Sequence, residues 1–434
     1  MPDRKLFTHY PEVIEYLYGQ LAYFQHSGAK ALKPGLKNIR LLCDHLGQPH
    51  LKFPSIHIAG TNGKGSTANM IAAVLQSAGY KTGLYTSPHL KSFTERIRIQ
   101  GIEIPEREVL SFVNKNLELI ENIQPSFFET TVAMAFQYFA QEEVDVAVIE
   151  VGMGGRLDST NIIYPVLSVI TNISYDHQAF LGETLQEIAA EKAGIIKENT
   201  PVVISQYQEE VFQVFEAKAR SCDADLFLAT KGFHLEYSKE AENFQVYKKD
   251  DLYLSNLKPD LKGEYQQKNL LGVLQSLEIL IKLGWEIRKS DIREGIELCT
   301  MYTGFKGRWQ ILHRLPLTIC DIAHNEDGIL EVFQQIKHLN YKNLHIITGF
   351  SKDKDIKKML AIYPSKAFYY FCHYNSPRAL NAYTLKETAQ SAGLSGKAFE
   401  SVSYALQEAQ NLADKNDLIL ILGSAYIIAE LAEI

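Results

Sequence analysis

The sequence predicts an α/β protein with two large domains, each built on a mostly parallel sheet. Buried-strand patterns rich in Val, Ile and Ala alternate with helical patterns along most of the 434 residues, as is typical of parallel strands joined by right-handed crossovers. The chain is also longer than one hydrophobic core usually supports. Because a Gly-containing connection at residues 300–308 separates two alternating regions, we place the domains at residues 1–300 and 301–434.

Composition narrows the class of protein. With 46% hydrophobic and 22% charged residues, the chain has the make-up of an ordinary globular protein. A formal net charge of -7 disfavours a broad surface for nucleic acid or anionic lipid. The five cysteines are scattered without a C-x-x-C pair, as expected of free thiols in a reducing cytosol. The sequence has neither the apolar core of a signal peptide nor eighteen consecutive apolar residues, so we expect a cytoplasmic protein that binds no membrane. We also expect it to be a monomer that binds no nucleic acid.

The chain opens with two predicted helices, at residues 9–25 and 36–46, and then reaches its most informative stretch, residues 53–76. There the pattern predicts a buried strand at 55–59, a tight turn and a helix at 66–75. Three glycines permit the turn, which we call the glycine loop (residues 60–65): Gly60, Gly63 and Gly65. Backbone N–H groups at the start of such a helix point at an anion, and the helix dipole favours negative charge there.

The side chains of this stretch also suit a phosphate group. Lys64 adds a positive charge, and Ser66 or Thr67 offers a hydroxyl to Mg²⁺. The sequence does not match the usual nucleotide-binding template G-x-x-x-x-G-K-[ST]. Ile58 occupies the position of the first glycine, and Gly65 occupies the position of the Ser or Thr, so the hydroxyl comes one residue later. A plain strand-to-helix turn with surface glycines is the alternative.

Two further polar residues are expected at strand ends, where ligands gather in open α/β sheets. Glu150 lies near the end of the strand VDVAVIEVG, and His177 follows the strand VLSVITNIS. If Glu150 is buried, its carboxylate needs a cation or a hydrogen-bond donor nearby. The alternative is that Glu150 lies at the edge of the sheet and reaches solvent. A single His more often donates a structural hydrogen bond than binds a metal.

Other charged residues are ambiguous on sequence alone. Arg96 and Arg98 alternate on one face of the segment ERIRIQ, which is either a solvated edge strand or an anion-contacting loop. Lys192 lies in a predicted helix at 184–197, and nothing local distinguishes it from a surface lysine. The remaining elements of this domain are strands at 82–87, 201–205 and 225–229, helices at 106–120, 127–142, 266–283 and 291–299, and short polar and aromatic strands between 229 and 263.

The second domain shows the clearest alternation. Its expected strands are LTICDI, NLHIITGF, AFYYFCHY and DLILILG, and its expected helices are at 327–338, 353–362, 384–394 and 403–414. Four residues lie at or just past the strand ends: Asp321, Gly349, His373 and Ser424. We expect the site of this domain at that edge. The Ser of LGSAY lacks the second Gly of a nucleophile elbow, so covalent serine catalysis is poorly supported.

Taken together, these motifs resemble the folylpolyglutamate synthase and dihydrofolate synthase family of Mur-type, ATP-dependent amide ligases. The similar motifs follow the family's order along almost the whole chain: GTNGKGST at 60, YTSPHL at 85, ERIRI at 95, FFET at 127, IEVGMGGRLDSTN at 149, ITNISYDHQAFLG at 170, AEKAGI at 190, GRW at 307, DIAHN at 321 and GFSKDKD at 349. The resemblance implies a P-loop ATPase domain that also binds the pterin or folate, then a smaller Rossmann-like domain, with the active site in the cleft between them.

The resemblance also implies roles for single residues. ATP is expected at Asn62, Gly63, Lys64, Gly65, Ser66, Asn269, Arg308 and Asp321. Two Mg²⁺ sites are implied, with ligands drawn from Ser66, Ser87, Glu150 and His177. The implied catalytic residues are Lys64, His177 and Lys192, and Lys192 matches a lysine that is carbamylated in this family. The pterin-bearing substrate is expected near Phe127, Phe128, Glu129 and Thr130, with Gly35 and Leu157 as weaker candidates.

The implied reaction joins L-glutamate to dihydropteroate or to the γ-carboxyl of a folate. A carboxylate is a poor acyl donor until ATP phosphorylates it, and an amine can then attack the acyl phosphate without a covalent enzyme nucleophile. The chain departs from the family pattern in two places. The family's DGAHNP appears as DIAHNE, and the larger side chain of Ile322 leaves the local backbone conformation open. The family's PGR appears as KGR, which retains Arg308.

Two other functions stay open. A cell-wall ligase would add an amino acid to a nucleotide-linked muropeptide, but the motifs FFET and YTSPHL argue against it. A nucleotide-binding switch without ligase activity would give no reason for ATP contacts in the C-terminal half.

Overall fold

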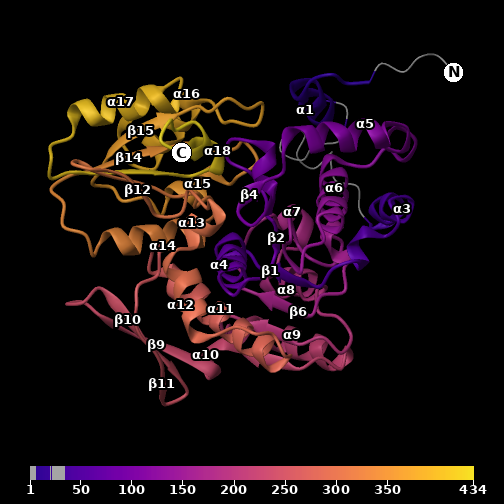
Figure 1. The fold of residues 1–434 in the computed structure, drawn as a ribbon. Helices are drawn as coiled ribbons and strands as arrows, with labels where there is room; N and C mark the ends of the chain where they lie inside the picture. Colours follow the sequence, from indigo (N-terminus) through magenta and orange to yellow (C-terminus); the bar gives the residue numbers. More distant parts are fainter. Residues whose placement is uncertain (1–5, 20, 22–34) are drawn as a thin grey trace. The chain divides into compact units, whose positions relative to one another are not determined.

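The larger sheet is centred on β1 (Ser55–Ala59), the strand that leads into the glycine loop. The computed structural model describes residues 6–19, 21 and 35–434 (Figure 1). The strand order is β4-β3-β2-β5-β1-β6-β7-β8. The other strands are β2 (Thr82–Tyr85), β3 (Ile97–Ile99), β4 (Ile102–Glu103), β5 (Val146–Glu150), β6 (Leu167–Ile170), β7 (Val202–Ile204) and β8 (Leu226–Leu228).

Six strands of this sheet run parallel to one another, namely β2, β5, β1, β6, β7 and β8. At one edge, β3 pairs antiparallel with β2, and β4 pairs antiparallel with β3. Every residue of β1, β5 and β6 is buried, which explains their continuous apolar sequences. Since β2, β5, β1 and β6 are neighbours, their carboxyl ends lie side by side. The glycine loop therefore leaves the sheet between the strand that ends in Glu150 and the strand that leads to His177.

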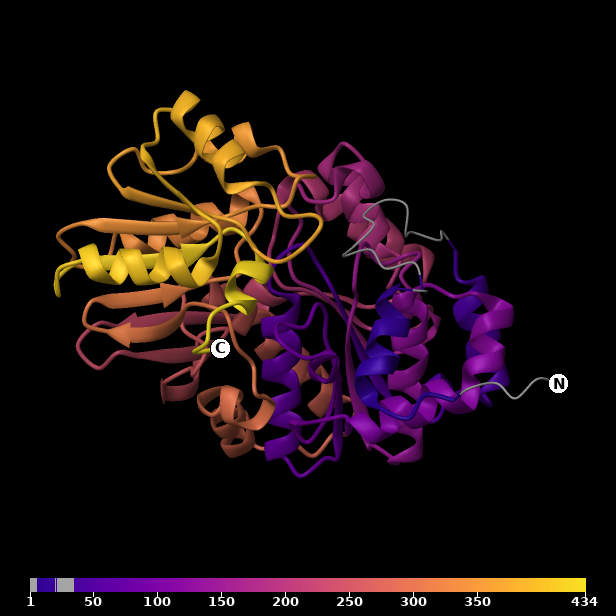
Figure 2. The same ribbon diagram turned by 90° about the horizontal axis from the view of Figure 1, so that it is seen from above.

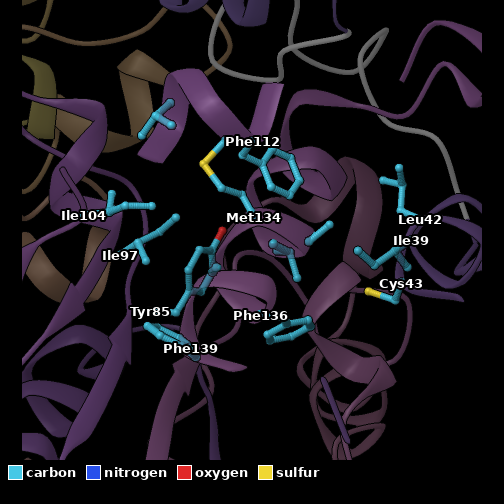
Figure 3. Packing of buried hydrophobic residues seen from close by; sticks show 14 of the residues in the cluster. Ile39, Leu42, Cys43, Tyr85, Ile97, Ile104, Phe112, Met134, Phe136 and Phe139 are labelled. Carbon is cyan, nitrogen blue, oxygen red and sulfur yellow. The ribbon is translucent and has the colours of Figure 1, made fainter. Parts of the chain in front are cut away.

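Helices cover the faces of this sheet. The long ones are α1 (Tyr10–Gly19), α3 (Lys37–His45), α4 (Lys64–Ser77), α5 (Glu106–Ile123), α6 (Phe127–Gln141), α8 (Leu185–Ala193), α9 (Glu209–Ser221), α11 (Tyr265–Lys282) and α12 (Lys289–Glu297). Short helices are α7 (Gln178–Leu181), α10 (Ala229–Gly232), α13 (Cys299–Thr303) and the 3-10 turns η2 (Pro49–Leu51), η3 (Phe93–Arg96) and η4 (Ser159–Ile162). Figure 3 shows part of the core, where Phe112 of α5 and Met134 of α6 lie near Tyr85 of β2.

A separate antiparallel sheet has the order β11-β10-β9, from β9 (Phe233–Ser238), β10 (Asn243–Lys248) and β11 (Asp251–Leu257). It corresponds to the short polar and aromatic strands expected between residues 229 and 263. Figure 1 shows these three strands beside α10.

Contacts divide the chain into two units, one of Met1–Asp260 and Gln266–Phe305, the other of Leu261–Tyr265 and Lys306–Ile434. The second unit has a sheet of order β12-β13-β17-β14-β15-β16, in which β12 alone is antiparallel. Its strands are β12 (Gln310–Arg314), β13 (Leu317–Cys320), β14 (Leu344–Thr348), β15 (Phe368–Cys372), β16 (Gly396–Phe399) and β17 (Leu418–Leu422). Its helices are α14 (Glu326–Ile336), α15 (Ile356–Leu360), α16 (Ala382–Ser391), α17 (Val402–Leu412) and α18 (Ala425–Ala429).

The helices of the second unit lie on both faces of its sheet. Figure 1 shows α16 and α17 above the strands and α14 below them, and Figure 2 looks onto the face that α17 covers. The doubly covered parallel sheet is the arrangement expected from the alternating pattern. Asp321, Gly349 and His373 directly follow β13, β14 and β15, as expected, and Ser424 comes two residues after β17.

Some sequence-based expectations were wrong in detail. The strand expected at 166–174 ends at Ile170, and β12 and β16 were not expected. The segment ERIRIQ is no solvated edge strand: Arg96 belongs to η3, β4 lies outside β3, and both arginines are buried. The helix expected at 9–25 is described up to Gly19, and the remainder lies outside the described residues apart from residue 21. No helix in the described ranges is long and apolar enough to cross a bilayer.

Candidate active site

The backbone of the glycine loop requires glycine at two positions. Gly60 has φ +147°, and a Cβ there would lie 1.8 Å from Thr171 Oγ1. Gly63 has φ +85° and would place a Cβ 2.2 Å from Asn269 Oδ1. Gly63 also immediately precedes α4 and provides no side-chain cap for its first N–H groups. Such uncapped donors are a ready site for an anion.

The loop is held by the segment that follows β6, which we call the exit segment (residues 171–177). The Thr61 N–H donates to the carbonyl oxygen of Asn172 at 2.8 Å, and the Ser174 N–H donates to Thr61 Oγ1 at 3.0 Å. The Asn62 N–H donates to Asn172 Oδ1 at 2.8 Å, and the Thr171 hydroxyl donates to the Asn62 carbonyl at 2.5 Å. These bonds fix the loop without any regular secondary structure in the exit segment.

Two lysines meet at one carbonyl oxygen of the loop. Lys64 Nζ donates to the carbonyl oxygens of Gly60 (3.0 Å) and Thr61 (3.1 Å). Lys192 Nζ, buried at the end of α8, also donates to the Gly60 carbonyl at 3.0 Å. Burial, together with the charge of Lys64, lowers the pKa of Lys192 to about 7. Two basic side chains thus meet beside the loop, and the surface-helix interpretation of Lys192 is wrong.

A buried polar chain reaches the hydroxyl of Ser66. Gln266 Nε2 donates to Ser66 Oγ at 3.1 Å, and Gln266 Oε1 accepts from Asn269 Nδ2 at 2.8 Å. Thr67 Oγ1 is buried without a hydrogen-bond partner among the described residues. Of the two candidate hydroxyls, Ser66 is therefore the one linked to the other site residues. Sequence reasoning missed Gln266, although its position one helical turn before Asn269 places it on the same face of α11.

The predicted metal ligands come from neighbouring strand ends. Glu150 is buried, and its Oε2 accepts from the backbone N–H of Ser87 at 3.0 Å. His177 stands at the start of α7 with φ +50°, and its Nε2 lies 3.8 Å from Asp176 Oδ2. Within residues 6–19, 21 and 35–434, no group of three His, Cys, Asp or Glu residues could hold a metal by itself. This set suits Mg²⁺, which is commonly bound by one or two carboxylates together with substrate phosphates.

The residues predicted to receive the pterin form the start of α6. Glu129 and Ser126 form a capping box, with the Ser126 N–H donating to Glu129 Oε2 at 2.7 Å, and Thr130 Oγ1 donates to the Ser126 carbonyl at 3.0 Å. Phe127 is buried, and the half-buried Phe128 contacts the ring of Tyr85.

The weaker candidates are different in character. Leu157 is 40% exposed, and Gly35 has φ +110° with no atom of the described residues within 4 Å of the position of a Cβ.

Arg96 lies beside the start of α6 and contacts Phe127 and His89. Its guanidinium lies 5.3 Å from the ring centroid of Phe127, and its Nε donates to His89 Nδ1 at 2.7 Å. Burial, with the charge of Arg96, holds the pKa of His89 well below its usual range. A neutral His89 is consistent with its Nδ1 accepting this bond.

In the second unit, Asp321 is a buried acceptor at the end of β13. Its Oδ2 accepts from the Tyr265 hydroxyl at 2.6 Å and from the Trp309 N–H at 2.8 Å, and its Oδ1 accepts from the Ala323 N–H at 2.8 Å. Burial raises the pKa of Asp321, while these bonds and the charge of Arg308 oppose the rise.

The backbone at Ile322, in the motif DIAHNE, is regular. The Ile322 N–H donates to the Gly307 carbonyl at 3.0 Å, and Ile322 is not among the described residues with positive φ. A side chain is therefore tolerated there without backbone strain. Asn325 caps α14 through a bond from the Gly328 N–H at 2.9 Å.

Two family profiles match this chain. The Mur ligase middle domain matches residues 58–277, and the Mur ligase, glutamate ligase domain matches residues 307–425. The first profile covers half of the chain and includes the last two residues of β1, the glycine loop and most of α11.

Individual relatives match almost the whole chain. The dihydrofolate synthase/folylpolyglutamate synthase of Bacillus subtilis is 34% identical over 441 residues, covering 98% of this chain and 99% of the relative. A probable bifunctional folylpolyglutamate synthase/dihydropteroate synthase of Haloferax volcanii is also 34% identical, and this chain spans 50% of its length.

Solved structures agree with this assignment. Escherichia coli FolC in complex with DHPP and ADP has a TM-score of 0.86 at 30% identity and covers 97% of this chain and 96% of its own. A bifunctional folylpolyglutamate synthase/dihydrofolate synthase with Mn, AMPPNP and L-glutamate bound has a TM-score of 0.82 at 27% identity, with 97% of both chains covered. The chain therefore belongs to the folylpolyglutamate synthase/dihydrofolate synthase family of Mur ligases.

Proposed function

We propose that this chain is an ATP-dependent amide ligase that adds L-glutamate to dihydropteroate, to the γ-carboxyl of a tetrahydrofolate, or to both. The observation that carries the proposal is the glycine loop, where the uncapped start of α4 and the side chains of Lys64 and Lys192 gather at the end of β1. Membership of the family supports the reaction class. The names of the relatives, and the DHPP and L-glutamate bound in two related structures, support the substrates.

The chemistry explains why a loop of this kind is needed. In the proposed reaction the acceptor carboxylate takes the γ-phosphoryl group of ATP, the amine of glutamate attacks the acyl carbon, and inorganic phosphate leaves as a proton is released. Two anions must approach each other first. Lys64 and the N–H groups of α4 would neutralise and orient the phosphates, so no covalent enzyme nucleophile is required.

ATP contacts are proposed at Asn62, Gly63, Lys64, Gly65, Ser66, Asn269, Arg308 and Asp321. Ser66, Ser87, Glu150 and His177 would hold two Mg²⁺ ions, whose charge would further neutralise the phosphates. Phe127, Phe128, Glu129 and Thr130, with Gly35 and Leu157, are proposed for the pterin-bearing substrate.

Lys192 is proposed as a catalytic residue together with Lys64 and His177. Its lowered pKa supports carbamylation, because only the neutral amine reacts with carbon dioxide. Such a carbamate would carry a negative charge and assist at the metal site.

The decisive experiment is ADP release measured with dihydropteroate and then with tetrahydrofolate, each with and without glutamate. The proposal predicts release that depends on both the pteroyl compound and glutamate. If neither acceptor supports glutamate-dependent release, the proposal fails. The two acceptors also show which of the two folate reactions this chain catalyses.

Two rival functions give other results in the same assay. A cell-wall ligase would release ADP only with a nucleotide-linked muropeptide as acceptor. A nucleotide-binding switch would hydrolyse ATP slowly and without regard to pteroates.

The five cysteines are unpaired, which supports our proposal of a cytoplasmic location. The monomeric state stays a prediction, which the mass in solution would test.

A further inference from the structure

The exit segment contains a buried residue whose backbone is paired by a side chain. Ile173 lies three residues beyond the end of β6 and is almost fully buried. Its N–H donates to Gln208 Oε1 at 2.8 Å, and its carbonyl oxygen accepts from Gln208 Nε2 at 2.7 Å. A single amide group thus satisfies both backbone groups of Ile173.

The path of the chain explains why a side chain is needed there. Pairing of β6 with β7 runs from Ser168 and Val202 to Ile170 and Ile204, and the last bond is from the Ser205 N–H to the Ile170 carbonyl. The chain then leaves the sheet, and Gln208 becomes the residue that precedes α9. Because a glutamine amide has the donor and acceptor of a peptide group, Gln208 replaces the missing strand backbone.

The other side of the exit segment holds the glycine loop. Asn172 and Ser174, the two neighbours of Ile173, bind Thr61 and Asn62 through backbone and side-chain hydrogen bonds. Alternate residues of an extended segment face opposite neighbours. The exit segment therefore lies between Gln208 and the loop, and four residues after Ile173 it reaches His177.

We propose that Gln208 is a positioning residue for nucleotide binding. It fixes Ile173, and through Asn172 and Ser174 it sets the path of the glycine loop at Thr61 and Asn62, which lead directly into the uncapped start of α4. This inference rests on the proposed function, since it assumes that the glycine loop receives the phosphates of ATP. Gln208 itself touches no reacting atom.

The test compares variants of Gln208 with a matched control in the full-length protein. Gln208→Leu removes both bonds and leaves the buried N–H and carbonyl of Ile173 unpaired. Gln208→Glu keeps an acceptor for the Ile173 N–H and loses the donor, so it serves if the leucine variant does not fold. The control is Gln186→Leu, because Gln186 Nε2 also donates to a backbone carbonyl, that of Glu210 in the first turn of α9, in an exposed bond that involves no residue of the exit segment or the glycine loop.

The readouts are the equilibrium Kd for ADP with Mg²⁺, the KM values for ATP and for the pteroyl acceptor, and the thermal midpoint. We expect Gln208→Leu to raise the Kd for ADP and the KM for ATP about tenfold, since a tenfold change is about 1.4 kcal/mol and lies within the cost of leaving a buried group unpaired. The KM for the acceptor should stay near that of the wild type. Gln208→Glu should give a smaller increase, and Gln186→Leu none.

Two results would overturn the inference. One is a Gln208→Leu protein that is less stable but binds ADP as tightly as the wild type, since that would make Gln208 merely structural. The other is an equal loss of ADP affinity in Gln186→Leu. Either result leaves the proposed function intact, whereas a wild-type protein without glutamate-dependent ADP release would refute the function itself.

Discussion

The side-chain ammonium groups of Lys64 and Lys192 both donate to the carbonyl oxygen of Gly60, each at 3.0 Å. One lysine comes from the first turn of α4 and the other from the end of α8, so the tertiary fold brings them together. Two cations this close repel each other unless an anion is present or one of them is neutral. The relationship therefore predicts that an anion binds beside the two lysines and that, without an anion, Lys192 titrates near neutral pH.

The titration of Lys192 should be visible in stability. Its folded-state pKa of about 7 lies below that of a lysine in the unfolded chain. Between these two values the unfolded state binds more protons, so the free energy of unfolding should rise with pH from about 7 towards 10, by at most about 1.4 kcal/mol per pH unit. Urea unfolding in bicarbonate-free buffer, without nucleotide, measures this slope.

The matched variant for this titration is Lys192→Met, which has no ammonium group. It should lose most of the dependence of stability on pH over the same range. An unchanged slope in Lys192→Met would assign the titration to another group.

The glycine loop can be tested with two glycines near the ends of α4. Gly63→Ala combines positive φ with a Cβ only 2.2 Å from Asn269 Oδ1, whereas Gly79→Ala has positive φ and open space around the Cβ. Both should lose about 1–2 kcal/mol of stability through backbone strain. Only Gly63→Ala should also weaken ADP binding, as titration calorimetry would show. Equal ADP affinities in the two variants would remove Gly63 from the nucleotide site.

Lys64→Ala should abolish most ligase turnover while the fold persists. Loss of one preorganised charge contact to a reacting group commonly lowers kcat by about 100-fold or more. Circular dichroism checks the fold, and Lys81→Ala is the control, since Lys81 is an exposed lysine paired with Glu142. A folded Lys64→Ala protein with near-normal glutamate addition would exclude Lys64 from the chemistry.

Glu150 and His177 should govern the response to magnesium. Glu150 ends β5 and His177 follows β6, and these two strands flank β1. A Mg²⁺ site that needs substrate phosphates is sensitive to each protein ligand. Glu150→Gln and His177→Ala should each require more Mg²⁺ for half-maximal ADP release. Glu183→Gln, at an exposed carboxylate six residues after His177, should respond like the wild type. Unchanged Mg²⁺ curves in both site variants would contradict the assignment.

The sequence was most informative where a local pattern determines local structure. The runs around Ile58, Val148 and Leu420 predicted buried parallel strands, and the structure confirms each one. The Gly, Lys and Ser of the loop predicted an anion-binding helix start for the same reason, because the turn and the helix follow each other directly.

The remainder depends on contacts between distant residues, which no local pattern encodes. Nothing near Lys192 indicates that it reaches Gly60, and nothing near Gln208 indicates that it replaces a strand beside Ile173. The sequence around Arg96 alternates like that of a strand, and Ile97–Ile99 do form β3, but Arg96 itself ends a 3-10 turn and is buried beside Phe127. The roles of the metal and substrate residues came from the family resemblance, and they stay predictions.

The measurement that tests the central claim most directly follows oxygen atoms. The acceptor carboxylate is labelled with ¹⁸O and incubated with the protein, ATP, Mg²⁺ and L-glutamate, and the inorganic phosphate is analysed by mass spectrometry. If the carboxylate attacks the γ-phosphate and glutamate then displaces phosphate, each new amide bond leaves one labelled oxygen in the phosphate. Amide product accompanied by unlabelled phosphate would contradict the account.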